Sequence, residues 1–395
     1  MTGPEDPRRR QAEGAADSFR RIQVRGSWGW LLAFAGGGGA VLAAVFDSGK
    51  AAAAAGQDWP PFVLVGGLLL VGLVADEDKL FSAAGYHLAG LPGNGVVLFA
   101  GAVVMISVVT AVLNLDTSVA FLTPVLIYTA RSRGKGEAPL LYGCLLLSNA
   151  ASLLLPGSNL TNLIVLGQLH LSGGRFATRM GPAWLAAIVV TAAVVAVAER
   201  RSLRTVSSGL AVPDGPVLGL GLAGIVAAVL LVVLLRSPAL PVLAVGAIAV
   251  GYRLARRCLG MARVGEVLGL PVLVGLFGVA VALGTAGRAW SGPEMLLGHL
   301  DSWGTAAVAA VASVLVNNLP AASLLASRVP KHPYALLVGL NLGPNLFVTG
   351  SLSWILWLRS ARTAGADPSI RHASRLGAIA VPLSIAAALG LLAVT

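Results

Sequence analysis

The chain has 395 residues, of which 56% are hydrophobic and only 11% are charged, and its mean hydropathy is +0.82. This composition excludes an ordinary soluble domain and predicts an integral membrane protein with about ten membrane segments of roughly 20 residues each. The formal net charge of +11 does not indicate nucleic-acid binding, because the arginines fall in short loops and in the N-terminal tail, where they set membrane orientation. We expect an all-α, multi-pass protein of the cell (inner) membrane with its N-terminus in the cytoplasm.

The first two spans follow a basic tail, residues 1–27, which we expect to be cytoplasmic. Residues 28–46 form the first predicted span, in which the run Gly36 to Gly39 favours close packing of another helix. The second span is predicted at residues 61–75. After it, an amphipathic stretch that ends at Leu91 is expected to lie in the membrane interface.

A helical hairpin is predicted for residues 95–130. This segment is long enough to cross the membrane nearly twice, but the polar residues 114–118 interrupt its centre, and Arg131 and Arg133 follow it. Because basic residues favour the cytoplasmic side, the economical interpretation is a re-entrant hairpin that enters from the cytoplasm and returns there. Asp116 then lies at its tip.

A broken transmembrane helix and a closing helix complete the first half. The broken helix is predicted at residues 139–169 with its break at 156–162, and the closing helix at residues 180–198. We therefore divide the chain into a first membrane repeat at 28–199, a cytoplasmic basic linker at 200–215 and a second membrane repeat at 216–395.

The second half repeats this order in the opposite direction. Its elements are predicted as spans at 216–235, 240–252 and 268–286, a hairpin from the outer face at 304–327, a helix at 334–358 broken near 349–351, and a last span at 376–394. Aligning the two polar tips puts Asp116 on Asn318, and one small gap puts Gly157-Ser158 on Gly350-Ser351. The sequence therefore predicts inverted repeats, with a chance match of short apolar strings as the alternative.

The polar breaks predict a binding site between the repeats. Polar groups at membrane depth are tolerated only when they are buried in protein or line a cavity, which is typical of secondary transporters. Asp116 is the only carboxylate that we place deep in the membrane, where it would bind a proton or a sodium ion, unless it merely caps the tip. The predicted substrate- or ion-binding residues are Asn114, Asp116, Thr117, Ser158, Asn159, Thr161, Asn317, Asn318, Asn345, Thr349 and Ser351, with Asp116 also as the proton-coupling residue.

These groups are amides and hydroxyls without a positive charge, and helix N-termini at the breaks add a modest positive potential. Such a site suits a small neutral polyhydroxyl species such as As(OH)3 or Sb(OH)3 better than a dicarboxylate, which would need an arginine. We expect neither a metal site nor a cofactor, because Cys144 and Cys258 fall in different predicted compartments and a soft-metal site usually needs clustered sulfurs. An enzyme is not expected, because the spans hold no paired carboxylates and no nucleophile with a base.

Several motifs resemble the arsenite permease branch of the ion transporter superfamily. They are Gly93-Asn94-Gly95 before the first hairpin, Leu122-Thr123-Pro124 after its tip, the runs 158–162 and 317–320, and Leu342-Gly343-Pro344-Asn345 with Gly350-Ser351-Leu352. The resemblance covers roughly residue 61 to the C-terminus and implies a scaffold and a transport unit, often in a homodimer, that move a substrate by alternating access. Two departures affect the substrate more than the fold. Leu115 stands where the family commonly has Asn, and the first repeat lacks one helix before its hairpin.

We therefore predict a secondary active transporter that exports arsenite and antimonite by proton coupling. The alternative is a sodium-coupled carboxylate transporter or a sodium/proton antiporter of the same superfamily. Expected partners are a small inorganic or small polar substrate, protons or sodium as the coupling ion, and the lipid bilayer. The sequence leaves open a homodimer and a cytoplasmic ATPase subunit.

Overall fold

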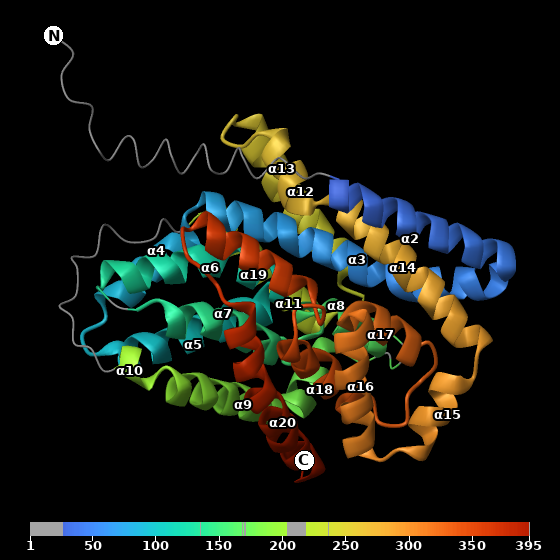
Figure 1. Ribbon diagram of the computed structural model, residues 1–395. Coiled ribbons are helices and arrows are strands. Elements are labelled where there is room, and N and C mark those ends of the chain that lie inside the picture. Colours follow the sequence, from blue (N-terminus) through green and yellow to red (C-terminus); the bar gives the residue numbers. More distant parts are fainter. Residues whose placement is uncertain are drawn as a thin grey trace.

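The computed structural model describes residues 27–134, 136–167, 169, 171–203, 219–235 and 237–394. Within these ranges every regular element is a helix (Figure 1). In the described part of the chain, six helical stretches are long and apolar enough to cross a membrane: Gly29–Phe46, Ser48–Glu77, Gly95–Val112, Gly173–Ala198, Met261–Ala289 and Ile370–Val394. The predicted all-α membrane fold is confirmed. Of the predicted tail and linker, only residues 27 and 200–203 belong to the described ranges.

One group of helices, which we call the scaffold group, consists of α2 (Ser27–Phe46), α3 (Ser48–Glu77), α11 (Leu220–Leu234), α12 (Ala239–Ala255) and α14 (Leu270–Ala289). Helices α2 and α14 lie side by side (Figure 1) and approach closely at glycines. A Cβ at Gly36 would lie 1.9 Å from the carbonyl oxygen of Gly275, so a side chain does not fit there. The predicted packing face is thus right for Gly36 and also for Gly39, which contacts α14, whereas Gly37 and Gly38 face open space.

Helix α3 begins well before the predicted span. Asp47 caps its N-terminus by accepting a hydrogen bond from the backbone N–H of Lys50 at 2.9 Å. Five alanines at 51–55 then favour a helix strongly enough to carry it through Pro60 and Pro61, which the sequence interpretation took as a boundary. This start places Asp58 inside α3 with 2% of its surface exposed. Asp58 is thus a second carboxylate within a helix long and apolar enough to span a membrane, and the sequence analysis had placed only Asp116 in such a segment.

Hairpin 1 consists of α5 (Gly95–Val112) and α6 (Leu115–Ser132), and it follows the short helix α4 (Leu80–Gly90). Arg133 is buried, and its guanidinium donates to the carbonyl oxygens of Ala89, Leu91 and Gly93 at 2.8, 2.5 and 2.7 Å. Because Gly93 precedes α5 and Arg133 follows α6, the chain leaves hairpin 1 beside the point where it enters.

Hairpin 2 consists of α16 (Ser302–Val316) and α17 (Asn318–Leu325), and it follows α15 (Gly292–His299). Its base is joined by a contact of 3.3 Å between Ser302 Oγ and His332 Nδ1. The turn at its tip is a single residue, Asn317, with a φ of +77°. With a ψ of 148°, this residue lies outside the left-handed α region in a conformation that glycine adopts far more readily, so the turn is strained.

Each hairpin is followed by a broken helix and a closing helix. The first set is α7 (Ala138–Ala151), the 3₁₀ turn η1 (Pro156–Ser158), α8 (Leu160–Leu166) and the closing helix α9 (Gly173–Ala198). The second set is α18 (Pro333–Leu342), η2 (Gly343–Leu346), α19 (Leu352–Thr363) and the closing helix α20 (Ile370–Val394). A proline lies in each 3₁₀ turn, where its missing N–H cannot continue an α-helix. The packing is reciprocal, because α6 of hairpin 1 contacts α19 and α17 of hairpin 2 contacts α8.

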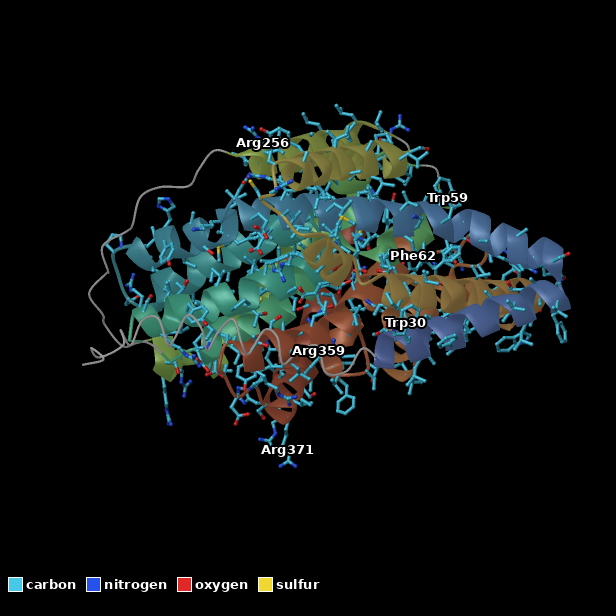
Figure 2. The ribbon with its side chains drawn as sticks, turned by 90° about the horizontal axis from the view of Figure 1, so that it is seen from above. Trp30, Trp59, Phe62, Arg256, Arg359 and Arg371 are labelled. Atoms are coloured by element: carbon cyan, nitrogen blue, oxygen red, sulfur yellow. The ribbon has the colours of Figure 1, made fainter. Side chains whose placement is uncertain are left out.

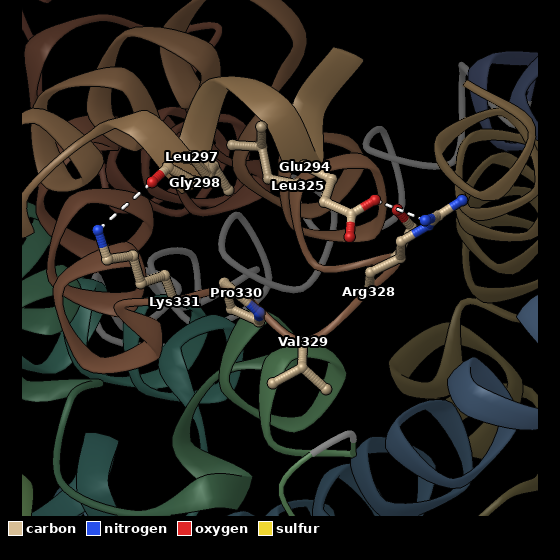
Figure 3. A pocket seen from close by; sticks show the side chains of 9 residues that line it. Glu294, Leu297, Gly298, Leu325, Arg328, Val329, Pro330 and Lys331 are labelled. Carbon is tan, nitrogen blue, oxygen red and sulfur yellow. Dashed lines mark hydrogen bonds and ion pairs between the residues drawn. The ribbon is translucent and has the colours of Figure 1, made fainter. Parts of the chain in front are cut away.

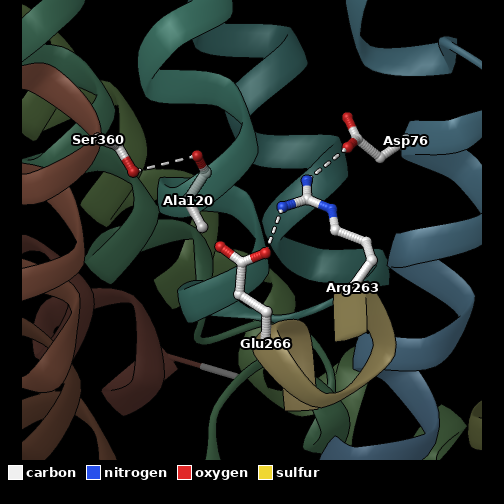
Figure 4. A network of polar contacts seen from close by, with 5 residues as sticks. All are labelled: Asp76, Ala120, Arg263, Glu266 and Ser360. Carbon is white, nitrogen blue, oxygen red and sulfur yellow. Dashed lines mark hydrogen bonds and ion pairs between the residues drawn. The ribbon is translucent and has the colours of Figure 1, made fainter. Parts of the chain in front are cut away.

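The helix ends form two distinct faces of the molecule. At the arginine-rich end, which also holds α10 (Arg200–Leu203) and α13 (Met261–Leu268), the guanidinium of Arg263 bridges Asp76 and Glu266 at 3.5 and 3.1 Å (Figure 4). Nearer the tip of hairpin 1, Ser360 Oγ donates to the Ala120 carbonyl at 3.2 Å, joining α19 to α6 (Figure 4). The opposite end holds α15 and the connection between α2 and α3 (Figure 1). Exposed tryptophans, Trp30 and Trp59, project from the scaffold group (Figure 2).

Candidate functional site

The two broken helices meet at their breaks, where Asn341 joins them. Its Oδ1 accepts hydrogen bonds from Ser152 Oγ at 2.8 Å and from Asn159 Nδ2 at 2.6 Å, and Thr161 Oγ1 lies 3.5 Å away. Its Nδ2 donates to Asn162 Oδ1 at 2.9 Å. All five side chains are buried. A side chain of α18 thus links the side chains of the first break, while Asn162 Nδ2 donates to the carbonyls of Ser152 and Leu155 at 2.7 and 3.1 Å.

The first break holds three of the predicted site residues. Asn159 is the N-cap of α8, and its Oδ1 accepts from the N–H of Thr161 at 3.2 Å. The hydroxyl of Ser158 lies 2.5 Å from the Ser152 carbonyl oxygen and 2.6 Å from that of Leu155. In this conformation Ser158 therefore closes the break rather than facing a ligand.

The second break packs directly on the tip of hairpin 2. The backbone N–H of Asn318 donates to the Gly350 carbonyl at 2.9 Å, and Asn317 Nδ2 donates to the Thr349 carbonyl at 3.1 Å. Thr349 Oγ1 in turn donates a hydrogen bond to the carbonyl of Val314 at 2.6 Å. Ser351, the N-cap of α19, is buried. The helix N-termini of α17 and α19 therefore lie next to each other.

The tip of hairpin 1 is built around the N-cap of α6. Asn114 Oδ1 accepts from the N–H of Thr117 at 2.6 Å, which holds the first turn together. Ser118 Oγ lies 3.4 Å from Ser148 Oγ of α7, so this tip also contacts the first broken helix. Asp116 lies in the same first turn and is half-buried. Within the described residues its carboxylate has no hydrogen bond and no ion pair.

Several polar atoms near the breaks are buried without a partner among the described residues. They are Asn114 Nδ2 and Thr117 Oγ1 at the first tip, Asn149 Oδ1 on α7, and Asn345 Oδ1 in η2. Asn345 is fixed by its other amide atom, because Nδ2 donates to the Leu146 carbonyl at 3.0 Å. A buried polar atom without a partner costs free energy, so these atoms are candidates for contact with a ligand or an ion.

Hydrogen bonds thus join the second tip to the second break, and Asn341 joins the first break to α18. The first tip contacts α7 through Ser118, and the role of all eleven residues in binding stays a prediction. Ser152 and Asn341, which hold the first break against α18, were not among the predicted site residues, although an Asn within an apolar helix is a signal for such an interhelical role. In the described parts of the chain no group of three His, Cys, Asp or Glu side chains is placed to hold a metal ion.

A cavity of about 210 Å³ lies at the other end of α17 from Asn318. Its lining includes Glu294, Arg328 and Lys331 (Figure 3). An ion pair of 2.5 Å joins Arg328 to Glu294, and Lys331 Nζ donates to the Gly298 carbonyl at 3.3 Å. The basic groups of this cavity are therefore engaged, and none of the predicted site residues lines it.

Comparison with known proteins gives a consistent result. A family model described as CitMHS, citrate transporter, matches residues 26–349. The arsenical pump membrane proteins of Escherichia coli and Yersinia enterocolitica are 26% and 28% identical to the chain, and each alignment covers 74% of this chain and 76% of the relative. The crystal structure of the Alcanivorax borkumensis YdaH transporter, described as having an unusual topology, aligns over 89% of this chain and 88% of its own length. Its TM-score is 0.52 at 15% identity, which is a likeness of fold.

The family match covers more than half of the chain, and the relatives are membrane transporters rather than enzymes. The multi-pass helical architecture described above agrees with that class. The protein therefore belongs to the CitMHS citrate transporter family of the ion transporter superfamily.

Proposed function

We propose that this transporter exports arsenite and antimonite by alternating access and that inward proton flow drives the export. The observation that carries the proposal is the chemistry of the candidate site. Its side chains are amides and hydroxyls, with a single carboxylate, Asp116, that has no partner among the described residues. Neutral As(OH)3 and Sb(OH)3 match donors and acceptors of this kind. The arsenical pump membrane proteins named above supply independent support.

Asp116 is the proposed coupling group. An ionisable side chain in a membrane segment is costly and is retained where it has a function. With no cation beside it among the described residues, Asp116 is free to exchange a proton as the site changes its exposure. The neighbouring unpaired atoms, Asn114 Nδ2 and Thr117 Oγ1, provide a donor and a hydroxyl for the metalloid hydroxide.

Alternating access is supported by the reciprocal packing of the two repeats. A two-fold axis that relates the repeats would superpose α6 on α17 and α19 on α8. The contact between α6 and α19 then corresponds to the contact between α17 and α8, and both contacts are present. We further propose that the membrane is the inner membrane and that the N-terminus is cytoplasmic, because arginines gather at the end where α3, α6, α9 and α12 finish. A homodimer and a cytoplasmic ATPase subunit remain expectations from the family resemblance.

A second candidate is a sodium-coupled carboxylate transporter, and the description of the family model as a citrate transporter favours it. A citrate ion carries several negative charges and would need cationic partners. The polar region around Asn341 offers none among the described residues. The chemistry of the site therefore favours a metalloid hydroxide over a carboxylate as the substrate.

The deciding experiment is uptake into everted membrane vesicles from cells that produce the protein. We expect arsenite uptake when a proton gradient is imposed, and no stimulation by a sodium gradient. Citrate is assayed in parallel in the same vesicles. Sodium-driven citrate uptake without arsenite uptake would replace the first candidate by the second.

A further inference from the structure

Asp58 on α3 is a buried carboxylate that the proposed site does not use. Its side chain is 2% exposed, and it forms neither a hydrogen bond nor an ion pair with the described residues. Buried polar groups that serve only the fold are normally satisfied by such partners. An unpaired acid in a membrane helix therefore indicates a function.

Arg288 on α14 lies across a small gap from this carboxylate. A Cβ at Gly284 would lie 3.1 Å from Arg288 Nη1 and 3.8 Å from Asp58 Oδ2, so the missing side chain keeps the space between the two charged groups open. Arg288 does not pair with Asp58. It donates to the Gly284 carbonyl at 2.9 Å and to the side-chain oxygen of Gln57.

Gln57 connects this cluster to the two hairpin-and-break units. Its Nε2 donates to the carbonyl of Ile164 at 2.9 Å and to that of Ala326 at 3.2 Å. Ile164 lies in the last turns of α8, and Ala326 is the C-cap of α17. One side chain of the scaffold group thus holds the ends of two helices whose other ends reach the candidate site.

We propose that Asp58 and Arg288 form a proton-controlled switch that holds or releases the ends of α8 and α17 through Gln57. With Asp58 neutral, Arg288 stays on Gln57, as in this structure, and both helix ends are fixed to the scaffold group. When Asp58 gives its proton to water at this end of the molecule, the carboxylate attracts Arg288 across the gap at Gly284. The side-chain oxygen of Gln57 then loses its bond from Arg288, which weakens the hold of Gln57 on the two helix ends and releases them.

Arg288 is the charged side chain that the helices around Asp58 place beside its carboxylate. Helices α2, α8 and α17 carry no titratable side chain, and Arg288 is the only one on α14. The next charges belong to Arg328, which donates to the Arg288 carbonyl at 3.3 Å, and to Glu294, with which Arg328 pairs. The switch rests on the proposed transport function, to which it adds a second proton-binding residue.

The test measures the distance between the scaffold group and the end of α17 in the absence of substrate. Spin labels are attached to Gly56→Cys, where the structure has open space, and to Val329→Cys, which is 59% exposed. The background carries Cys144→Ser and Cys258→Ser. Pulsed double electron–electron resonance in nanodiscs then gives the distance distribution at acid and at alkaline pH.

We expect a short distance at acid pH and a second, longer population at alkaline pH. Asp58→Asn should keep the short distance at both, Gly284→Ala should do the same by filling the gap, and Gln57→Ala should give the longer population at both. The matched control, Asp47→Asn, removes a half-buried acid of the same helix end and should leave the pH response intact. A pH response that survives in Asp58→Asn, or a short distance that persists in Gln57→Ala, would overturn the switch.

This readout separates the switch from the transport proposal, because it needs neither substrate nor gradient. A pH-dependent distance in a protein that fails to move arsenite would overturn the proposed function alone. Proton-driven arsenite transport in a protein whose distance ignores pH would overturn the switch alone.

Discussion

Replacing Asn341 by leucine tests whether the polar crossing holds the two broken helices together. The side chain of Asn341 forms hydrogen bonds with Ser152, Asn159, Thr161, Asn162 and Leu337. Hydrogen bonds inside membrane proteins contribute about 0.6 kcal/mol each on average, so these five correspond to about 3 kcal/mol. The buried amides of Asn159 and Asn162 lose their partner at Asn341, which raises the expected cost toward about 5 kcal/mol.

The assay is the free energy of unfolding of the purified protein, measured by titration with a denaturing detergent. Asn149→Leu is the matched control, because Asn149 is the same residue type on α7 with one hydrogen bond, to the Leu145 carbonyl of its own helix at 3.2 Å. Its Oδ1 is buried without a partner, so we expect little loss there. Equal losses in the two variants, or an unchanged Asn341→Leu, would refute the account of the crossing.

Three further predictions concern the coupling residue, the thiols and the scaffold. Asp116→Asn should abolish gradient-driven arsenite uptake without lowering the amount of protein in the membrane, and full uptake by this variant would remove Asp116 from the mechanism. The double change Cys144→Ser, Cys258→Ser should keep most of the uptake, whereas loss of uptake in a correctly inserted protein would argue for thiol coordination of the metalloid. Gly36→Leu should destabilise the protein by more than about 2 kcal/mol by forcing α2 away from α14, while Gly37→Leu, in open space, should not; thermal denaturation of both variants measures the difference.

The sequence could predict the helices and the breaks because both depend on local signals. Asn114, Asn159 and Asn317 each interrupt an apolar segment and each cap the helix that follows, so their positions mark the segment ends directly. The start of α3 was missed because Pro60 and Pro61 predict a helix boundary, whereas the helix continues through both of them. Here five alanines precede them.

The centre of the site and the cluster at Asp58 could not be predicted, because both depend on partners distant in the sequence. Asn341 meets Asn159 across 182 positions, and Gln57 meets Ala326 across 269. Hydropathy and spacing carry no information about which helices lie side by side at such separations. Gln57 also escaped notice because it lies before Pro60, outside the predicted span.

The two hairpin tips differ in exposure, and the difference bears on the direction in which the site opens. At the first tip Leu113 and Leu115 are 1% and 4% exposed, whereas at the second tip Leu315 is 74% exposed. Repeats related by a two-fold axis have equivalent surroundings only in a symmetric, occluded state. Under the proposed inverted repeat, the two tips are therefore not equivalent in this conformation, because Leu315 is exposed although the second break packs on the neighbouring Asn317 and Asn318. The contact of Gln57 with the ends of α8 and α17 lies at the far end of hairpin 2 from Leu315, so within the proposed cycle its release belongs to the step that exchanges the two states.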